Sequence, residues 1–168
     1  MLKKIDPKEL NVNPFTLLDN DWALLMAGDK DSFNSMTVSW GGVGVLWRKN
    51  VSTVYVRQSR YTKEFMDNSD YYTLTFLKDG YKDKLSLLGT KSGRDIDKMN
   101  VEGLNLVELE NGFGYEESKL VLVCKKLFKN DLKESQFLVD GLFDECYPDK
   151  DDFHTMYIGE IVGCYINE

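Results

Sequence analysis

The chain has 168 residues, of which 42% are hydrophobic, and a formal net charge of −7. This length can bury one core and is short for two domains, so we expect a single domain over residues 1–168, with its core between about residues 13 and 166. The excess of acids argues against nucleic-acid or anionic-membrane surfaces, because these are bound mainly by Lys and Arg.

Metal and membrane signals are both weak. The three cysteines, Cys124, Cys146 and Cys164, have no CxxC spacing, and His154 is the only histidine, so we expect no metal site and mostly structural, reduced thiols. No apolar run is long enough to span a bilayer, and no apolar segment of a signal peptide follows Met1–Pro7. The sequence therefore predicts a soluble, cytoplasmic protein.

Strands dominate the expected elements, after a polar lead-in over residues 1–21. We expect strands at Trp22–Ala27, Asn34–Trp40, Val45–Trp47, Thr53–Arg57, Tyr71–Leu77, Leu104–Leu109, Lys119–Phe128 and His154–Ile166. The Gly41–Gly44 segment is interpreted as a turn that another group can approach closely. No βαβ pattern or internal repeat is visible, so we predict a mainly β fold, an antiparallel β-barrel with short α-helices.

Three short helices are expected between the strands. Thr62 is a candidate N-cap, and Gly80–Leu88 has apolar residues at helical spacing before Gly89. Ser92 and Asp95 have the spacing of a capping box, which predicts a third helix through Lys98. The acidic stretches at 130–134 and 140–152 look the least ordered.

One segment stands out by its charge. Ser32–Lys63 contains no Asp or Glu, although about five would be expected from 28 acids in 168 residues. The segment ends in a strand and turn where Arg57, Ser59, Arg60 and Thr62 lie together. Guanidinium and hydroxyl donors before a helix start favour a phosphate, but a solvated basic turn is the alternative. Further along, Lys91, Ser92, Arg94 and Lys98 either add to this anion site or are solvated beside a Ser92–Asp95 cap.

Four motifs resemble, in order and spacing, the flavin reductase-like family of FMN-binding split β-barrels, close to its flavoredoxin-like branch. They are Asn34–Gly42, Tyr55–Thr62, Gly89–Lys98 and His154–Ile161. No GxGxxG, Walker A or nucleophile-elbow motif competes with this interpretation.

The resemblance implies a flavin site. The strand residues Asn34, Met36, Thr37, Val38, Ser39 and Trp40 would run along the isoalloxazine ring, and Arg57, Ser59, Arg60, Tyr61, Thr62, Lys91, Ser92 and Lys98 would bind the rest of FMN, chiefly its phosphate. Trp40 and Tyr61 could cover a ring face, although such aromatics are more often core or dimer contacts.

Two charged residues of the last strand have open roles. His154 follows Asp152-Phe153, where related reductases have Gly-Asp before the histidine, and it either orients substrate or reduced flavin or is an acid-paired surface histidine. Glu160 lies in an apolar strand, so we expect an ion pair with a Lys or Arg rather than catalysis.

The function implied by the resemblance is an NAD(P)H:flavin oxidoreductase that passes hydride from NADH or NADPH to FMN as a homodimer. Gly41–Gly44 stands where many such reductases have a Pro-rich turn. This difference favours a flavoredoxin-like electron-transfer protein with tightly bound FMN, an acceptor-protein partner and little NAD(P)H turnover as the alternative. A barrel that binds a ligand without redox chemistry is the third hypothesis.

Overall fold

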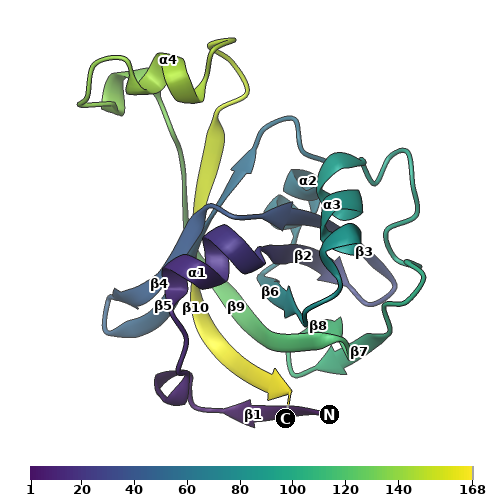
Figure 1. Cartoon of the computed structure of the whole chain (residues 1–168). Helices are drawn as coiled ribbons and strands as arrows, with labels where there is room; N and C mark the ends of the chain where they lie inside the picture. The colour runs from purple at the N-terminus through teal and green to yellow at the C-terminus, as the bar shows by residue number, and fades with distance from the viewer. Residues whose placement is uncertain (168) are drawn as a thin grey trace.

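The computed structural model describes residues 1–167, which form one strongly curved antiparallel sheet with short helices around it (Figure 1). The sheet order is β3-β2-β6-β9-β10-β5-β4, and β1 pairs with β10. The strands of this sheet are β1 (Leu2–Ile5), β2 (Ala23–Asp29), β3 (Ser32–Val38), β4 (Gly41–Leu46), β5 (Lys49–Arg57), β6 (Tyr71–Leu77), β9 (Ser118–Asp131) and β10 (His154–Asn167). A separate hairpin joins β7 (Leu106–Leu109) to β8 (Gly112–Tyr115).

The two long strands β9 and β10 join the two halves of the sheet. Each has 14 residues, and β10 pairs with β9, β5 and β1. The register between β9 and β10 shifts after Ile158, and the next residue, Gly159, lies so close to Tyr72 that an added Cβ would be 2.7 Å from the ring. Such bulges bend a strand and increase its twist, which helps the sheet curve around its core.

The sheet buries apolar side chains on both of its faces. The concave core includes Leu25, Leu74, Leu122 and Tyr157, all at most 1% exposed. A second cluster, on the other face of β2 and β6, receives α3 (Lys82–Thr90) and the β7–β8 hairpin. Strands that are buried on both faces have continuous apolar sequences instead of alternating ones. This explains why the segments Trp22–Ala27 and Lys119–Phe128 are so apolar.

The amino-terminal segment has more structure than the expected lead-in. It contains β1, the 3-10 helix η1 (Pro7–Glu9), the short helix α1 (Pro14–Thr16) and the π-helical turn η2 (Leu17–Asp21). Because β1 pairs with the end of β10, both ends of the chain lie at the same side of the sheet (Figure 1).

The prediction of a turn at Gly41–Gly44 is wrong, because these residues form the first part of β4. Added Cβ atoms at Gly42 and Gly44 would meet nothing within 4 Å, so their lack of side chains serves no close contact within this chain. The turn lies instead at Trp47 and Arg48, both with positive φ (51° and 60°). That is the geometry of a two-residue hairpin turn, formed here without the usual Asn or Gly.

Two helix predictions are corrected in detail. Helix α2 runs over Thr62–Asn68, but its N-cap is Tyr61, and Thr62 is the first helical residue. Helix α3 continues through Gly89 to Thr90, so Gly89 is not its C-cap. The capping-box prediction for Ser92–Lys98 is wrong: the segment forms turns, with Asp95 and Ile96 donating to the Ser92 carbonyl, and it contains no helix.

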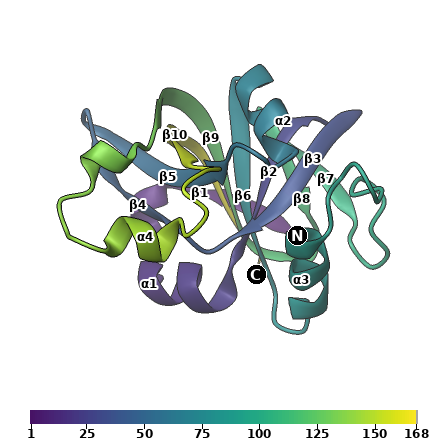
Figure 2. The same ribbon diagram turned by 90° about the horizontal axis from the view of Figure 1, so that it is seen from above.

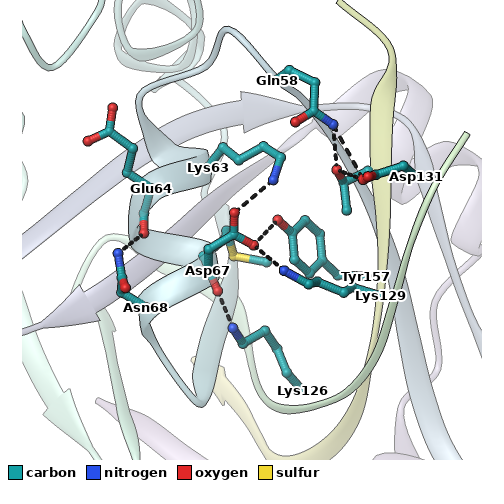
Figure 3. A network of polar contacts seen from close by, with 11 residues as sticks. Gln58, Lys63, Glu64, Asp67, Asn68, Lys126, Lys129, Asp131 and Tyr157 are labelled. Carbon is teal, nitrogen blue, oxygen red and sulfur yellow. Dashed lines mark hydrogen bonds and ion pairs between the residues drawn. The ribbon is translucent and has the colours of Figure 1, made fainter.

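Asp67 attaches α2 to β9 and β10 (Figure 3). Its carboxylate accepts hydrogen bonds from Lys63 (2.7 Å) and Lys129 (3.1 Å), and from the Tyr157 hydroxyl (2.8 Å). Burial alone would raise the pKa of Asp67, but these three donors lower it to about 2. The helix, and with it Thr62, is therefore held against the sheet.

A projecting arm, residues 132–153, connects β9 to β10 and extends from the body at the upper left of Figure 1. It contains the 3-10 helix η3 (Glu134–Gln136) and α4 (Leu142–Cys146). Its own small core is aromatic, formed by Phe137, Phe143, Tyr147 and Phe153, whose ring centroids are 5.2–6.1 Å apart. The stretch that looked least ordered in the sequence is thus organised by these rings.

Candidate functional site

A cavity of about 190 Å³ lies where β3, the β5–α2 turn and the segment after α3 meet. We call it the anion cavity. Nine of the residues predicted to bind the cofactor line it: Asn34, Met36, Ser59, Arg60, Tyr61, Thr62, Lys91, Ser92 and Lys98. Segments about 30 residues apart in sequence therefore meet as the motif order suggested, with α2, β3 and α3 side by side in Figures 1 and 2.

The charge in this cavity is positive, and its two innermost cations donate to carbonyl oxygens. Lys98 is only 4% exposed, and its ammonium donates to the carbonyl oxygens of Ser35 (2.8 Å) and Leu88 (2.7 Å). Arg60 donates to the Gly89 carbonyl at 2.8 Å. Within residues 1–167, no carboxylate forms an ion pair with Lys98 or Arg60.

Burial and a neighbouring positive charge lower the pKa of each cation. Burial, with the charge of Arg60 added, lowers the pKa of Lys98 to about 8. Burial also lowers the pKa of Arg60, partly offset by Asp152. A buried and a half-buried cation that donate only to neutral carbonyls are stabilised when an anion arrives, so the cavity has the electrostatics of an anion site.

The walls of the cavity fit tightly around its polar groups. The Asn34 side-chain amide donates to the Thr62 hydroxyl at 2.8 Å, across 28 residues of sequence. Gly93 lies against both β3 and the turn, since an added Cβ would be 2.0 Å from Asn34 Oδ1 and 3.0 Å from Tyr61 Cδ1. The absence of a side chain at Gly93 lets the loop after α3 close one wall.

Two predicted phosphate ligands, Arg57 and Ser59, contact the arm instead. Arg57 does not line the anion cavity: its guanidinium reaches the carbonyls of Cys146 (3.5 Å) and Asp152 (3.4 Å) and lies 5.2 Å from the Tyr147 ring centroid. Ser59 lines the cavity, but its amide and hydroxyl both donate to the Asp152 carboxylate, at 2.7 and 2.6 Å.

His154 is a buried, neutral imidazole at the base of the arm. It is 8% exposed, its Nδ1 is 2.5 Å from the Tyr147 hydroxyl, and its ring centroid is 5.2 Å from that of Trp40. Burial and the charge of Arg57 lower its pKa to about 4. The alternative of an acid-paired surface histidine is therefore wrong. A tyrosine hydroxyl that donates to Nδ1 of a neutral ring leaves the ring proton on Nε2, and this is the tautomer that we expect.

A second cavity, of about 610 Å³, lies at the other end of the predicted flavin strand. Ser39 and Trp40 line it together with Phe15 and Leu18, and Trp40 is 53% exposed. Between the two cavities, Val38 is buried in the core, and the Thr37 hydroxyl donates to the Leu85 carbonyl at 2.5 Å. The strand and its continuation thus connect an anion cavity to a larger, partly apolar one.

Several functional contacts were missed in the sequence or expected elsewhere. Thr90 and Gly93 also line the anion cavity, and both belong to the Gly89–Lys98 motif, from which only Lys91, Ser92 and Lys98 were predicted to bind the cofactor. Tyr147 and Asp152 come from the arm, where no local pattern indicates a contact. Arg94, which the sequence left open between the anion site and solvent, does not line the cavity: it pairs with Glu64 and lies over the Tyr61 ring.

The Glu160 prediction is confirmed by its ion pair with Lys49 at 2.8 Å. The thiols of Cys124 and Cys164 are buried, which raises their pKa values to about 12 and 11, whereas Cys146 is partly exposed. Across residues 1–167, no group of three or more His, Cys, Asp and Glu side chains is arranged to hold a metal ion. No helix in the same range is both long and apolar enough to cross a bilayer.

The sequence matches no protein-family model and no curated protein, but the fold matches solved structures. Flavoredoxin from Methanosarcina acetivorans matches with a TM-score of 0.66 at 22% identity, over 95% of this chain and 75% of that one. A flavin reductase-like FMN-binding domain from Shewanella baltica gives 0.68 at 15% identity, over 99% and 77%. The styrene monooxygenase flavin reductase from Pseudomonas putida gives 0.65 at 13% identity, over 88% and 80%.

These matches confirm the fold prediction: the chain has the FMN-binding split-barrel fold, a mainly β antiparallel architecture with short helices. Its structural neighbours are flavin reductase-like FMN-binding domains, and they include flavoredoxins as well as reductases.

Proposed function

We propose that this protein is an FMN-binding flavoprotein whose anion cavity holds the phosphate of the cofactor. The observation that carries the proposal is the buried Lys98 beside the half-buried Arg60, with no carboxylate of residues 1–167 in an ion pair with either. A volume of about 190 Å³ is below the roughly 300–1,000 Å³ of complete ligand pockets. The cavity therefore fits a phosphoryl end, and the rest of the cofactor extends outside it.

The ring system would extend along β3 toward Ser39 and Trp40, since that strand leads from the anion cavity to the larger one. Bound FMN would supply a two-electron acceptor at this place. The protein's own part is to hold the phosphate, to orient the ring with backbone and hydroxyl groups of residues 34–40, and to present His154 as a neutral donor beside Trp40.

The proposed activity is hydride transfer from NADH or NADPH to FMN. The second candidate is a flavoredoxin-like carrier that a partner protein reduces, and the structural match to two flavoredoxins supports keeping it. Both readings include FMN as the cofactor, and they differ in whether a nicotinamide dinucleotide is a substrate.

Two measurements separate these functions. FMN that co-elutes with the purified protein and gives it a yellow colour supports both redox functions, whereas a protein that stays colourless after incubation with FMN excludes both and leaves a non-redox barrel. Anaerobic addition of NADH or NADPH then bleaches bound FMN if the protein is a reductase. Bound flavin that both nicotinamides leave oxidised supports the carrier.

We further propose that the protein is a homodimer. Exposed apolar residues gather on the β4–β5 hairpin and the neighbouring part of β9: Val45 is 75% exposed, Trp47 55% and Phe128 42%, and the Trp47 and Phe128 rings are 6.0 Å apart. Apolar side chains grouped on one surface are typical of interfaces.

A further inference from the structure

The turn that carries Ser59 already binds an anion, and that anion belongs to the same chain. The Ser59 amide donates to Asp152 Oδ1 at 2.7 Å, and its hydroxyl donates to Asp152 Oδ2 at 2.6 Å. Two donors on the two oxygens of one carboxylate is the arrangement that proteins offer to carboxylate and phosphate ligands. Ser59 also lines the anion cavity, next to Arg60, so Asp152 stands at the edge of that cavity as a ligand would.

The same short segment holds the end of the arm through several further contacts. The Gln58 amide donates to the Phe153 carbonyl at 3.3 Å. Arg57 reaches the carbonyl oxygens of Asp152 and Cys146 at 3.4 and 3.5 Å. These are long bonds to neutral acceptors, so the paired bonds from Ser59 are the shortest polar link between the arm and the turn.

The arm also has features of a segment that can be released. Asp152 and Lys150 have φ values of 51° and 54°, in the left-handed region, which aspartate adopts more readily than lysine. Leu138 is 95% exposed and Val139 63%. The aromatic cluster packs the arm mainly on itself, so the arm can keep its internal structure when its end detaches.

A phosphate in the anion cavity and the Asp152 carboxylate would compete for the same donors, and both carry negative charge. We propose that Asp152 is a built-in competitor of the anion cavity: its carboxylate caps Ser59 when no ligand is present, and it leaves when a phosphate-bearing ligand binds. Ligand binding then transfers the Ser59 donors from Asp152 to the ligand and releases the end of the arm. This inference rests on the proposed function for the identity of the ligand, and it adds a coupling between the cavity and residues 132–153.

Three variants test the competition. Asp152→Asn removes the charge and keeps a side chain that tolerates positive φ, and Asp152→Gly removes the side chain where glycine is at ease. Asp151→Asn is the matched control: it removes the same charge from the exposed neighbouring residue, which has no hydrogen bond or ion pair to the turn. Affinities are measured for FMN, for inorganic phosphate and for riboflavin, which lacks the phosphate.

We expect both Asp152 variants to bind FMN and phosphate about five- to twentyfold more tightly than the wild type, because a charged competitor for two hydrogen bonds is gone. Riboflavin affinity stays unchanged in all variants, and Asp151→Asn stays within about twofold of the wild type for every probe. Equal gains in Asp151→Asn and Asp152→Asn would overturn the proposal in favour of general electrostatics. Unchanged or weaker binding in both Asp152 variants would also overturn it.

Hydrogen exchange of the backbone amides tests the release of the arm. FMN or phosphate should speed exchange of residues 147–153 in the wild type, and the Asp152 variants should show faster exchange of the Ser59 amide and of residues 147–153 without any ligand. Slower exchange of the arm on binding would contradict the proposal. If phosphate binds but FMN does not, the proposed function fails while phosphate still tests the competition; if neither binds any variant, both proposals fail.

Discussion

At the scale of single residues, the central feature is an ammonium group without a carboxylate partner. Lys98 is buried, with a pKa lowered to about 8, and donates only to two main-chain carbonyls. A phosphate dianion beside it favours the charged form, so the complex takes up a proton when the free protein has lost it. Near neutral pH this lysine is charged, and its charge is destabilised by burial until an anion binds beside it.

Lys98 should make FMN binding depend on pH. Below pH 8 the lysine is charged and the affinity is constant; above pH 8 the free protein deprotonates and the affinity falls by up to about tenfold per pH unit. Titrations of flavin fluorescence between pH 6.5 and 9.5 measure this fall. In Lys98→Met the affinity is lower at pH 7 and the slope above pH 8 is lost. A slope that persists in this variant would assign the effect to another group.

The second residue-scale prediction concerns His154, the only histidine in the chain. Its single imidazole can be followed by NMR without assignment, and we expect a pKa of about 4 and a proton on Nε2. Tyr147→Phe should leave the ring with a mixture of tautomers, because the donor to Nδ1 is gone. A wild-type pKa near the ordinary 6.5 would show that the imidazole is solvated and not held by the arm.

The same lowered pKa has a consequence for stability. Above pH 6.5 the histidine is neutral in both the folded and the unfolded chain. Between pH 6.5 and 4 only the unfolded chain takes up the proton, so the contribution of His154 to the free energy of unfolding decreases as the pH falls through this window, and that contribution levels off below pH 4. Urea unfolding at several pH values should show this decrease in the wild type, and a smaller one in His154→Asn.

At the scale of elements, the loop after α3 forms a wall of the cavity through one glycine. Gly93→Ala would place a methyl group 2.0 Å from Asn34 Oδ1, so the loop must move outward and the wall opens. We expect FMN affinity to fall at least about tenfold, since phosphate contacts depend on positions held within about half an ångström. Gly44→Ala, whose Cβ meets nothing within 4 Å, should bind FMN like the wild type. Equal binding by both variants would show that the loop does not shape the site.

Local patterns predicted the elements better than their ends and connections. The strand at Tyr71–Leu77 is predicted with its observed bounds, because its apolar run is bordered by turn residues on both sides. The Trp47–Arg48 turn was missed, since positive φ at these residues is imposed by the pairing of β4 with β5 and not by their own preferences. Ser92 and Asp95 have the spacing of a capping box, but the segment forms turns and no helix. Its Lys98 side chain is instead bound to the Ser35 carbonyl of β3.

The site shows the same division between local and long-range information. Nine of the predicted cofactor residues line one cavity because their motifs lie on elements that the fold brings together. Arg57 and Ser59 have the right chemistry for a phosphate, but the arm, which comes from about 90 residues later in the chain, contacts both. A contact of this kind depends on tertiary packing, so the types and spacing of neighbouring residues do not indicate it.

At the scale of the whole molecule, the apolar surface of the β4–β5 hairpin predicts self-association. If the proposed dimer uses this surface, Trp47→Lys should shift the protein from dimer to monomer, because it would place a charge in the contact. Analytical ultracentrifugation measures the shift, and Val12→Lys, at an exposed position of the amino-terminal segment, is the control. A wild type that is monomeric at micromolar concentration would remove the homodimer from the account.

The central claim is that Arg60 and Lys98 hold the phosphate of a flavin. Its most direct test compares the affinities of FMN and riboflavin, which differ only in that phosphate, for the wild type and for Arg60→Gln. Charge-assisted hydrogen bonds contribute about 1.5–3 kcal/mol each, so the wild type should prefer FMN by about a hundredfold or more, and the variant should lose at least about tenfold of this preference with riboflavin binding unchanged. An equal preference for FMN in both proteins would place the phosphate elsewhere and contradict the account.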